Sequence, residues 1–237
     1  SLLDFGARYY DAYTCRWNAI DPLAHKYFGM SPYNYCGNDP VNRVDPDGMT
    51  DYFDNDGNFL LSDSNDNGEI RITTQDTIDD AKQYWGEEWE TVLVSDGYST
   101  LFHSAVNSSN MSEDAVKKVY EYCNTTGVPI QIVSSGEHSF FVSIDNPEII
   151  QINAKRASLS VWIDGQKYYL HDNKYNNTST LKHEAVHTNQ VSNGSHLEHD
   201  EAELEAYNQQ MSDESYGYTT PEYKKYTENN RSRYESH

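Results

Sequence analysis

The chain has 237 residues and carries 38 acidic against 17 basic side chains, a formal net charge of −21 at pH 7. Phosphate groups are bound mainly by Lys and Arg, so this charge disfavours nucleic acid and anionic membranes as partners. No apolar run is long enough for a membrane-spanning helix, which needs about 18 residues. Only 36% of the residues are hydrophobic, yet 20 Tyr and 4 Trp provide enough ring surface for a folded core.

The N-terminus and the cysteines indicate how the chain is made and in which compartment. The chain begins with Ser rather than Met, and we expect it to be part of a longer protein. Its N-terminus lacks the charged, apolar and small-residue order of a secretion signal. The cysteines, Cys15, Cys36 and Cys123, are few and widely spaced, which argues for synthesis in a reducing compartment. A single Cys15–Cys36 disulfide is left open as an alternative.

Residues 1–49 differ in kind from the rest of the chain. They are dense in Tyr, Asn, Pro and Gly, as in short strands joined by tight turns. This segment closely resembles the Rhs repeat-associated core, and the matching stretches are residues 2–11, 16–24, 31–35 and 38–49. We therefore predict two parts, with the C-terminal part of an Rhs core at 1–49 and a separate domain at 50–237.

The resemblance to Rhs proteins implies self-cleavage at the end of this segment. In that family the core closes a β-shell, and an arginine and two aspartates release the C-terminal toxin. By motif these residues fall on Arg8, Asp21 and Asp45, with the cut between Met49 and Thr50. The competing interpretation is that both aspartates only form turns with the prolines that follow them. Because the chain holds little of the shell, we expect that it fails to cut itself.

Residues 50–110 form an acidic, turn-rich lead-in to the second part. The Asp-Asn-Asp-Gly stretch at 54–57 predicts a hairpin turn. A strand is expected at 70–73 and a short helix at 77–85. This stretch is expected to precede the catalytic part of the domain.

Residues 111–237 are predicted to form that catalytic part. A helix is expected from a Ser112 cap to about Tyr122, with Ala115, Val116, Val119 and Tyr120 facing inward. Short antiparallel strands follow, at 129–133, 140–144, 149–153, 159–163 and 167–170. Together with the helices predicted after them, these strands indicate an α+β fold.

Residues 183–187 read His-Glu-Ala-Val-His, which is an HExxH motif. On a helix, the i, i+4 spacing places His183 and His187 on one face, where both imidazoles can bind one metal ion. Glu184 then lies beside a water molecule on that ion. Histidine pairs at this spacing also occur by chance on inert surfaces, so the surrounding sequence has to decide.

The sequence around the motif predicts a helix over residues 178–191. The polar residues 176–179 resemble a helix start, and 192–195 contain a Gly that ends it. Between them, Leu181, Val186 and their neighbours provide an apolar inward face. This context favours a functional metal site.

Catalytic zinc usually has three protein ligands and one open position, so a third ligand is needed. The extended motif HExxHxxGxxH would require Gly and His where this chain has Gln190 and Asn193. Glu203, in an ExxA pattern ending at Ala206, is the preferred third ligand. An opposing interpretation makes Asp200 a helix N-cap and Glu203 its capping-box partner. The other candidate ligands are Glu201, Glu205, His196 and His199.

The HExxH motif together with residues 203–210 resembles the glutamate-zincin metallopeptidases, and in particular toxin-associated members with the pattern E-x-[DE]-A-Y-x-x-Q. The resemblance implies a zincin-like domain that binds Zn2+ through His183, His187 and Glu203. Glu184 acts as general base in such a site. It also implies that an edge strand lines the substrate groove, where a peptide can add as a further strand. For the oxyanion donor, the sequence leaves Tyr207, Tyr216, Tyr218 and His171 open.

The two resemblances together predict an Rhs-type polymorphic toxin with a C-terminal zinc metalloendopeptidase. Such an antibacterial effector is made in the bacterial cytoplasm and delivered into target cells. The expected partners are a protein or peptide substrate, the Rhs shell of the parent chain, a cognate immunity protein and a type VI secretion spike. Neither nucleic acid binding nor membrane insertion is expected.

Two other functions compete with this prediction. The first is a zinc-stabilised binding or structural module without turnover. Glu184 argues against it, because a structural zinc site has no use for a carboxylate beside an open coordination position. The second is a metal-dependent nuclease, which the negative charge disfavours.

Overall fold

The computed structural model describes residues 2–4, 9–11, 14, 16–18, 50–63, 68–94, 97–134, 138–154, 160–195 and 197–235. Several residues singled out from the sequence lie outside these ranges, namely Arg8, Cys15, Asp21, Cys36, Asp45, Met49 and His196. The chain divides into two compact units, Ser1–Asp47 and Gly48–His237, and each is described by itself. Among the described residues, no helix is long and apolar enough to cross a membrane.

The first unit contains a small antiparallel sheet. Its strands are β1 (Leu2–Asp4), β2 (Tyr9–Asp11) and β3 (Arg16–Trp17), in the order β1-β2-β3. Leu2 pairs with Asp11, and Asp11 pairs in turn with Arg16. The described residues of this unit thus lie mostly in short strands, as the sequence predicts for the start of the chain.

The second unit begins with a four-stranded sheet in the order β5-β4-β6-β7. The strands are β4 (Asp51–Phe53), β5 (Phe59–Ser62), β6 (Ile70–Ile72) and β7 (Thr100–Leu101). The predicted hairpin turn joins β4 to β5, and there the Asp54 carboxylate accepts hydrogen bonds from the backbone N–H groups of Asp56 and Asn58. Gly57 has a positive φ of 74°, which a residue without a side chain adopts at little cost.

A helical segment connects β6 to β7. It consists of α1 (Gln75–Trp85), the 3-10 turn η3 (Gly86–Glu88) and α2 (Trp89–Leu93). The Thr74 side chain caps α1 by accepting a hydrogen bond from the backbone of Thr77. The side chains of Ile78 and Leu93 are buried against Tyr52 of β4, and this contact packs the helical segment onto the sheet.

The main core lies under α3 (Phe102–Asn107) and α4 (Glu113–Cys123). Ser112 caps α4 as predicted, and the four expected inward residues are all buried. They pack against a second sheet, which consists of β8 (Ile130–Val133), β9 (Phe140–Ser143) and β10 (Asn146–Asn153) in the order β8-β10-β9.

The second sheet corrects one expectation, because it is mixed rather than purely antiparallel. β9 and β10 form an antiparallel hairpin, but β8 pairs with β10 in parallel. β9 pairs with one side of β10, and β8 pairs with the other side, where it runs in the same direction as β10. β9 is consequently an edge strand of this sheet.

A small hairpin leads into the helical part of the unit. Its strands are β11 (Val161–Ile163) and β12 (Gln166–Tyr168), and the 3-10 turn η4 (Leu170–Asp172) follows. The strand expected at 167–170 therefore ends early, because Leu170 turns inward to join a cluster with Tyr216 and Tyr223.

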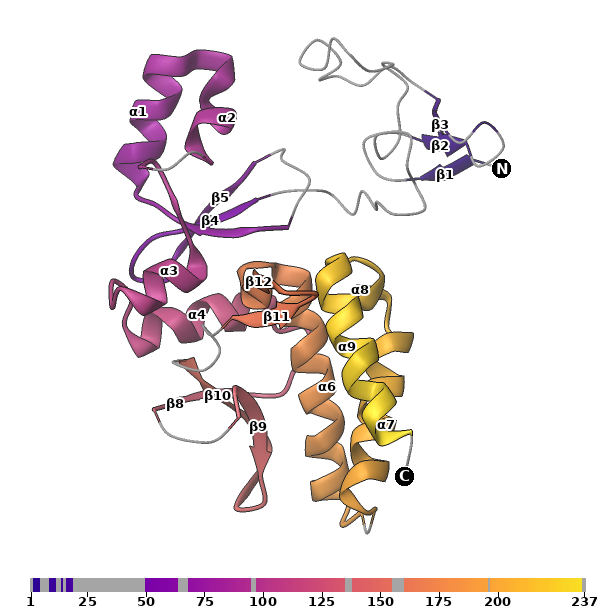
Figure 1. Cartoon of the computed structure of the whole chain (residues 1–237). Coiled ribbons are helices and arrows are strands. Elements are labelled where there is room, and N and C mark those ends of the chain that lie inside the picture. The colour runs from indigo at the N-terminus through magenta and orange to yellow at the C-terminus, as the bar shows by residue number, and fades with distance from the viewer. Residues whose placement is uncertain are drawn as a thin grey trace. The chain divides into compact units, whose positions relative to one another are not determined.

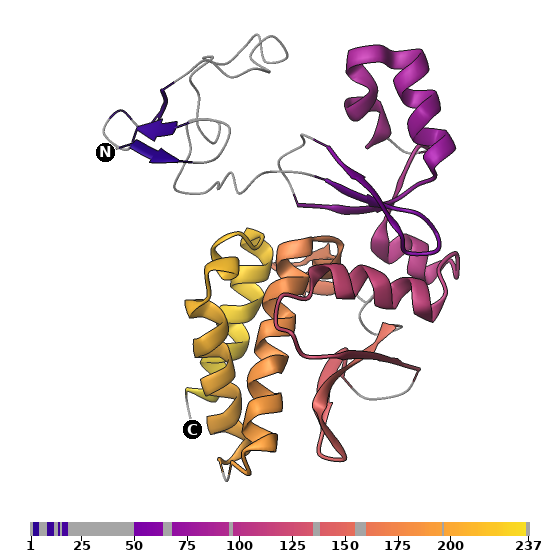
Figure 2. The same ribbon diagram turned by 180° about the vertical axis from the view of Figure 1, so that it is seen from behind.

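Four helices complete the unit: α6 (Lys174–Ser192), α7 (His199–Ser212), α8 (Glu214–Gly217) and α9 (Pro221–Tyr234). α6 packs against β9 and β10 on one side and against α7 on the other, and α7 also contacts α9. Figures 1 and 2 show this order from two sides, with α6 between the sheet and the remaining helices. The combination of these helices with the two sheets confirms the α+β fold class.

The start of α6 was predicted wrongly. The helix begins at Lys174 rather than near residue 178, and the Asn173 side chain caps it by accepting from the backbone N–H groups of Tyr175 and Asn176. Asn176 and Asn177, expected before the helix, lie buried within it. Their side-chain amides donate to the backbone carbonyls of η4, which explains why these polar residues occur inside a helix.

Candidate metal centre

Two neighbouring helices bring the predicted ligands together. His183 and His187 lie one turn apart on α6, and Glu203 lies on α7 opposite them. The Nε2 atoms of the two histidines are 3.2 Å apart. One carboxylate oxygen of Glu203 is 3.4 Å from Nε2 of His183, and the other is 3.4 Å from Nε2 of His187. Among the described residues, this is the cluster of His, Cys, Asp and Glu side chains that could hold a metal ion.

The spacing of these three groups fits a tetrahedral ion. Metal–ligand distances of about 2.0–2.1 Å place neighbouring ligand atoms about 3.3–3.4 Å apart at a tetrahedral site. The observed separations of 3.2, 3.4 and 3.4 Å agree with this value. Two imidazole nitrogens and one carboxylate leave a fourth position for water or substrate.

Both imidazoles are held from the side facing away from this cluster. Nδ1 of His183 is 3.2 Å from the amide oxygen of Gln210, and Nδ1 of His187 is 2.7 Å from that of Gln190. Nε2 of each ring is therefore the nitrogen directed at Glu203. Sequence reasoning missed both contacts, although Gln190 follows His187 at the i, i+3 spacing that places helical side chains together.

The opposite charges of the cluster shift its pKa values. Burial by itself would raise the pKa of Glu203, but hydrogen bonds and charge from the two histidines hold it well below its usual range. Burial would likewise lower the pKa of His187, but the hydrogen bonds with Glu203 and Gln190 and the charges of Glu184 and Glu203 together outweigh burial and raise this pKa to about 9. Without a metal ion, His187 and Glu203 thus form an ion pair near neutral pH.

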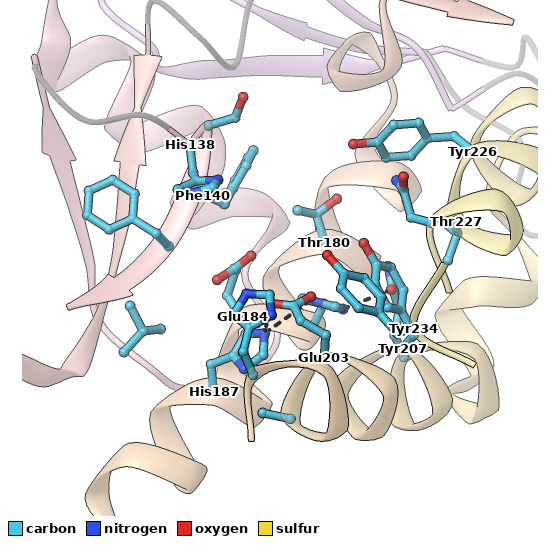
Figure 3. A pocket seen from close by; sticks show the side chains of 18 of the residues that line it. His138, Phe140, Thr180, Glu184, His187, Glu203, Tyr207, Tyr226, Thr227 and Tyr234 are labelled. Carbon is cyan, nitrogen blue, oxygen red and sulfur yellow. Dashed lines mark hydrogen bonds and ion pairs between the residues drawn. The ribbon is translucent and has the colours of Figure 1, made fainter. Parts of the chain in front are cut away.

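Glu184 lies in the same pocket and has a different environment. Its side chain is buried, and burial raises the pKa of its carboxyl group, against the lowering effect of the nearby histidines. In Figure 3 the carboxyl group points into the pocket beside the histidines, on the side of His138 and Phe140. A carboxylate that takes up a proton more readily than usual is suited to general base catalysis.

Of the other candidate ligands, the three that the structure describes are not part of the cluster, whereas His196 lies outside the described residues. Glu205 accepts a hydrogen bond from Gln190, Glu201 is exposed, and His199 contacts the adjacent Asp200 on the surface. The capping-box interpretation of Glu203 is wrong, because α7 begins at His199 after Glu198 and has no side-chain cap. The carboxylate of Glu203 is thus free to face the histidines.

The cluster opens into a pocket of about 750 Å3. Residues of β9, β11, η4, α6, α7 and α9 line it. Of the residues considered for oxyanion stabilisation, Tyr207 and His171 line the pocket, and the Tyr207 ring lies 4.4 Å from that of His183. Tyr216 packs in a separate apolar cluster and Tyr218 contacts Tyr175.

Three further side chains in this pocket were missed from the sequence. Figure 3 shows His138, Tyr226 and Tyr234 around the cavity, and all three are among its lining residues. Their positions follow from the packing of β9 and α9 against α6 and α7, which no local motif reveals.

Comparison with known families adds independent information. The family model for metallopeptidase toxin 2 matches residues 51–234, which is nearly the whole second unit. No significant match was found among curated proteins or among solved structures. The family describes a toxin that cleaves peptide bonds with the help of a metal ion, and the second unit contains a cluster suited to binding one. The chain therefore belongs to the metallopeptidase toxin 2 family.

Proposed function

We propose that residues 50–237 form a zinc endopeptidase in which His183, His187 and Glu203 bind the ion and Glu184 is the catalytic base. The observation that carries this proposal is the tetrahedral spacing of the three ligand groups, with the Glu184 carboxyl group in the same pocket. Two nitrogen ligands and one oxygen ligand with an open position are typical of catalytic zinc.

In the proposed mechanism Glu184 takes part in two proton transfers. A zinc ion held by His183, His187 and Glu203 would polarise the peptide carbonyl and lower the pKa of water at the site. Glu184 accepts a proton from the attacking water and later donates it to the departing amine. The raised pKa of Glu184 supports this role, because a stronger base takes up the proton more readily. Tyr207, His171, His138, Tyr226 and Tyr234 are the pocket residues from which an oxyanion donor is to be sought.

The shape of the pocket supports an extended polypeptide as substrate. β9 is an edge strand whose residues Phe140–Val142 line the pocket opposite α7 and α9. A substrate segment can pair with the free edge of β9, and its scissile bond then lies near Glu184. Because such pairing uses main-chain hydrogen bonds, it tolerates many different side chains in the substrate. Selectivity for substrate sequence would then come from the side chains of the pocket walls.

We further propose that this domain is the toxic end of an Rhs protein with an antibacterial role. The closely matching motifs of residues 1–49 support this context. It includes a cut between Met49 and Thr50 carried out by Arg8, Asp21 and Asp45, delivery by a type VI secretion spike, and a neutralising immunity protein. The cut is proposed for the complete Rhs protein, and we expect this chain to stay uncut because it holds little of the shell. Intact mass measurement of the purified chain checks that expectation, and an Asp45→Asn variant provides the uncleaved reference.

The catalytic proposal is tested by separating metal binding from turnover. The wild-type chain should contain about one zinc ion, and a His183→Ala, His187→Ala double variant should contain none. Glu184→Gln should keep the zinc and lose both cleavage of an unfolded protein substrate and toxicity on expression. Glu201→Gln is a suitable control, because Glu201 is exposed on the first turn of α7.

Each outcome has a defined meaning. Full toxicity of Glu184→Gln rejects the catalytic role of this residue. Zinc retained by the double histidine variant rejects the proposed ligands. A wild-type chain that binds zinc and cleaves nothing would support the non-catalytic module instead.

A further inference from the structure

We propose that Gln190 and Gln210 are positioning residues that hold a proton on Nδ1 of His187 and His183 and so direct both Nε2 atoms at the metal. The inference rests on the proposed function, because it assumes a metal ion at this cluster. It concerns two neutral amides, whereas carboxylates and backbone carbonyls are common partners of metal-binding histidines.

The orientation of the Gln190 amide follows from its other contacts. Its nitrogen donates to the backbone carbonyl of Ala202 at 3.1 Å and to the Glu205 carboxylate at 2.9 Å. Both of these groups can only accept hydrogen bonds. The amide oxygen must then face His187, where it lies 2.7 Å from Nδ1. An oxygen that only accepts requires a proton on Nδ1, so Nε2 is the nitrogen that gives up its proton and offers its lone pair when a metal ion binds.

A longer hydrogen-bond chain orients Gln210 in the same way. It starts at the backbone carbonyl of Asn176, which accepts from the Thr180 hydroxyl at 2.9 Å. With its proton used there, Thr180 accepts from the Tyr223 hydroxyl at 2.6 Å. Tyr223 then accepts from the Gln210 nitrogen at 2.8 Å, and the Gln210 oxygen faces Nδ1 of His183 at 3.2 Å. Once the Thr180 hydroxyl donates to the Asn176 carbonyl, the Tyr223 hydroxyl and the Gln210 amide can each be oriented in one way in this chain.

The two glutamines also connect the helices that supply the ligands. Gln190 extends from α6 to the backbone of α7, and Gln210 extends from α7 to His183 and Ser179 on α6. Gln210 is almost fully buried, so its amide would be costly to place there without these partners. The same contacts therefore set the protonated nitrogen of each histidine and the separation of α6 from α7.

Zinc affinity measured by chelator competition tests the proposal. Gln190→Leu and Gln210→Leu should each weaken zinc binding by about 10- to 100-fold. Gln209→Leu is the matched control, since Gln209 is the neighbouring glutamine on α7 but is exposed. Gln210→Glu keeps an acceptor for Nδ1 and should bind zinc more tightly than Gln210→Leu. Equal losses in Gln210→Leu and Gln210→Glu would indicate a packing role and overturn the inference.

Nitrogen-15 spectra of the histidine rings give a second readout that does not depend on activity. A proton on Nδ1 of both His183 and His187 is expected with and without zinc, and an unprotonated Nδ1 on either ring overturns the inference. Gln190 lies at the partly exposed edge of α6, so Gln190→Leu keeps the test decisive if Gln210→Leu fails to fold. A wild-type chain without zinc affinity would reject the proposed function, whereas unchanged affinity in both Leu variants would reject only this inference.

Discussion

Raising the pH of the metal-free protein should weaken its fold through His187. The Glu203 carboxylate and the neighbouring charges raise the pKa of this histidine from 6.5 to about 9 in the folded chain. A folded-state pKa above the unfolded value means that the protonated form stabilises the fold. The stabilisation is fully present below pH 6.5 and is lost as the pH rises through about 9.

The size of this effect follows from the shift in pKa. The rise of this pKa from 6.5 to about 9, at about 1.4 kcal/mol for each tenfold change in the acid constant, corresponds to at most about 3.5 kcal/mol of unfolding free energy. The His187 side chain is only 16% exposed, so solvent screens the ion pair weakly. A bound zinc ion occupies Nε2 in place of the proton, so the zinc-loaded protein should show little of this pH dependence.

Urea unfolding of the chelator-treated protein at several pH values between 6 and 9.5 measures this loss. The same series with excess zinc provides the comparison. Glu203→Gln removes the carboxylate and should flatten the profile of the metal-free protein without changing the length of the side chain. A metal-free wild type that keeps its full stability from pH 6.5 to 9.5 would refute the ion pair as the source of the shift.

Three substitutions elsewhere test the packing that supports the site. Leu181→Ala removes a fully buried side chain of α6 and should cost about 2–5 kcal/mol in urea unfolding. A cost below about 1 kcal/mol would mean that the core closes around the gap. Lys174→Met removes the cation 3.2 Å from the buried carboxylate of Asp51 and should lower the unfolding free energy by about 3–5 kcal/mol. In thermal melts, an added Asp51→Asn change should recover part of this loss, because it removes the unpaired buried charge. Gly57→Ala places a Cβ atom 2.2 Å from the Ala115 carbonyl oxygen at a positive φ, and its melting temperature should fall; an unchanged value would contradict this close approach.

Local patterns predicted the elements whose determinants lie within a few residues of one another. The hairpin at 54–57, the Ser112 cap of α4 and the helix through the HExxH motif all depend on short-range hydrogen bonds or on helical periodicity. The sequence also indicated two histidines on one face of a helix, because the i, i+4 spacing alone places them there.

Local patterns could not predict the hydrogen-bond partners of polar side chains when those partners lie in another part of the fold. Asn176 and Asn177 carry the residue type of a helix cap, but in the fold they bind the carbonyls of η4 from within α6. An amide can satisfy its hydrogen bonds locally or across the fold, and the sequence does not distinguish the two cases. The parallel pairing of β8 with β10 was not foreseen either, because it joins segments about 20 residues apart and no local motif fixes the direction of such a pair.

The amino-acid sequence by itself determined the HExxH helix and the residue types available to bind a metal ion, because both depend on spacing along one helix. Tertiary structure alone decided that the carboxylate of Glu203, rather than those of Glu201 or Glu205, faces the histidines. It also decided that Gln190 and Gln210 meet the far sides of the same rings. These contacts depend on how α6 and α7 pack, and that packing is set by burial summed over the whole domain rather than by any local motif.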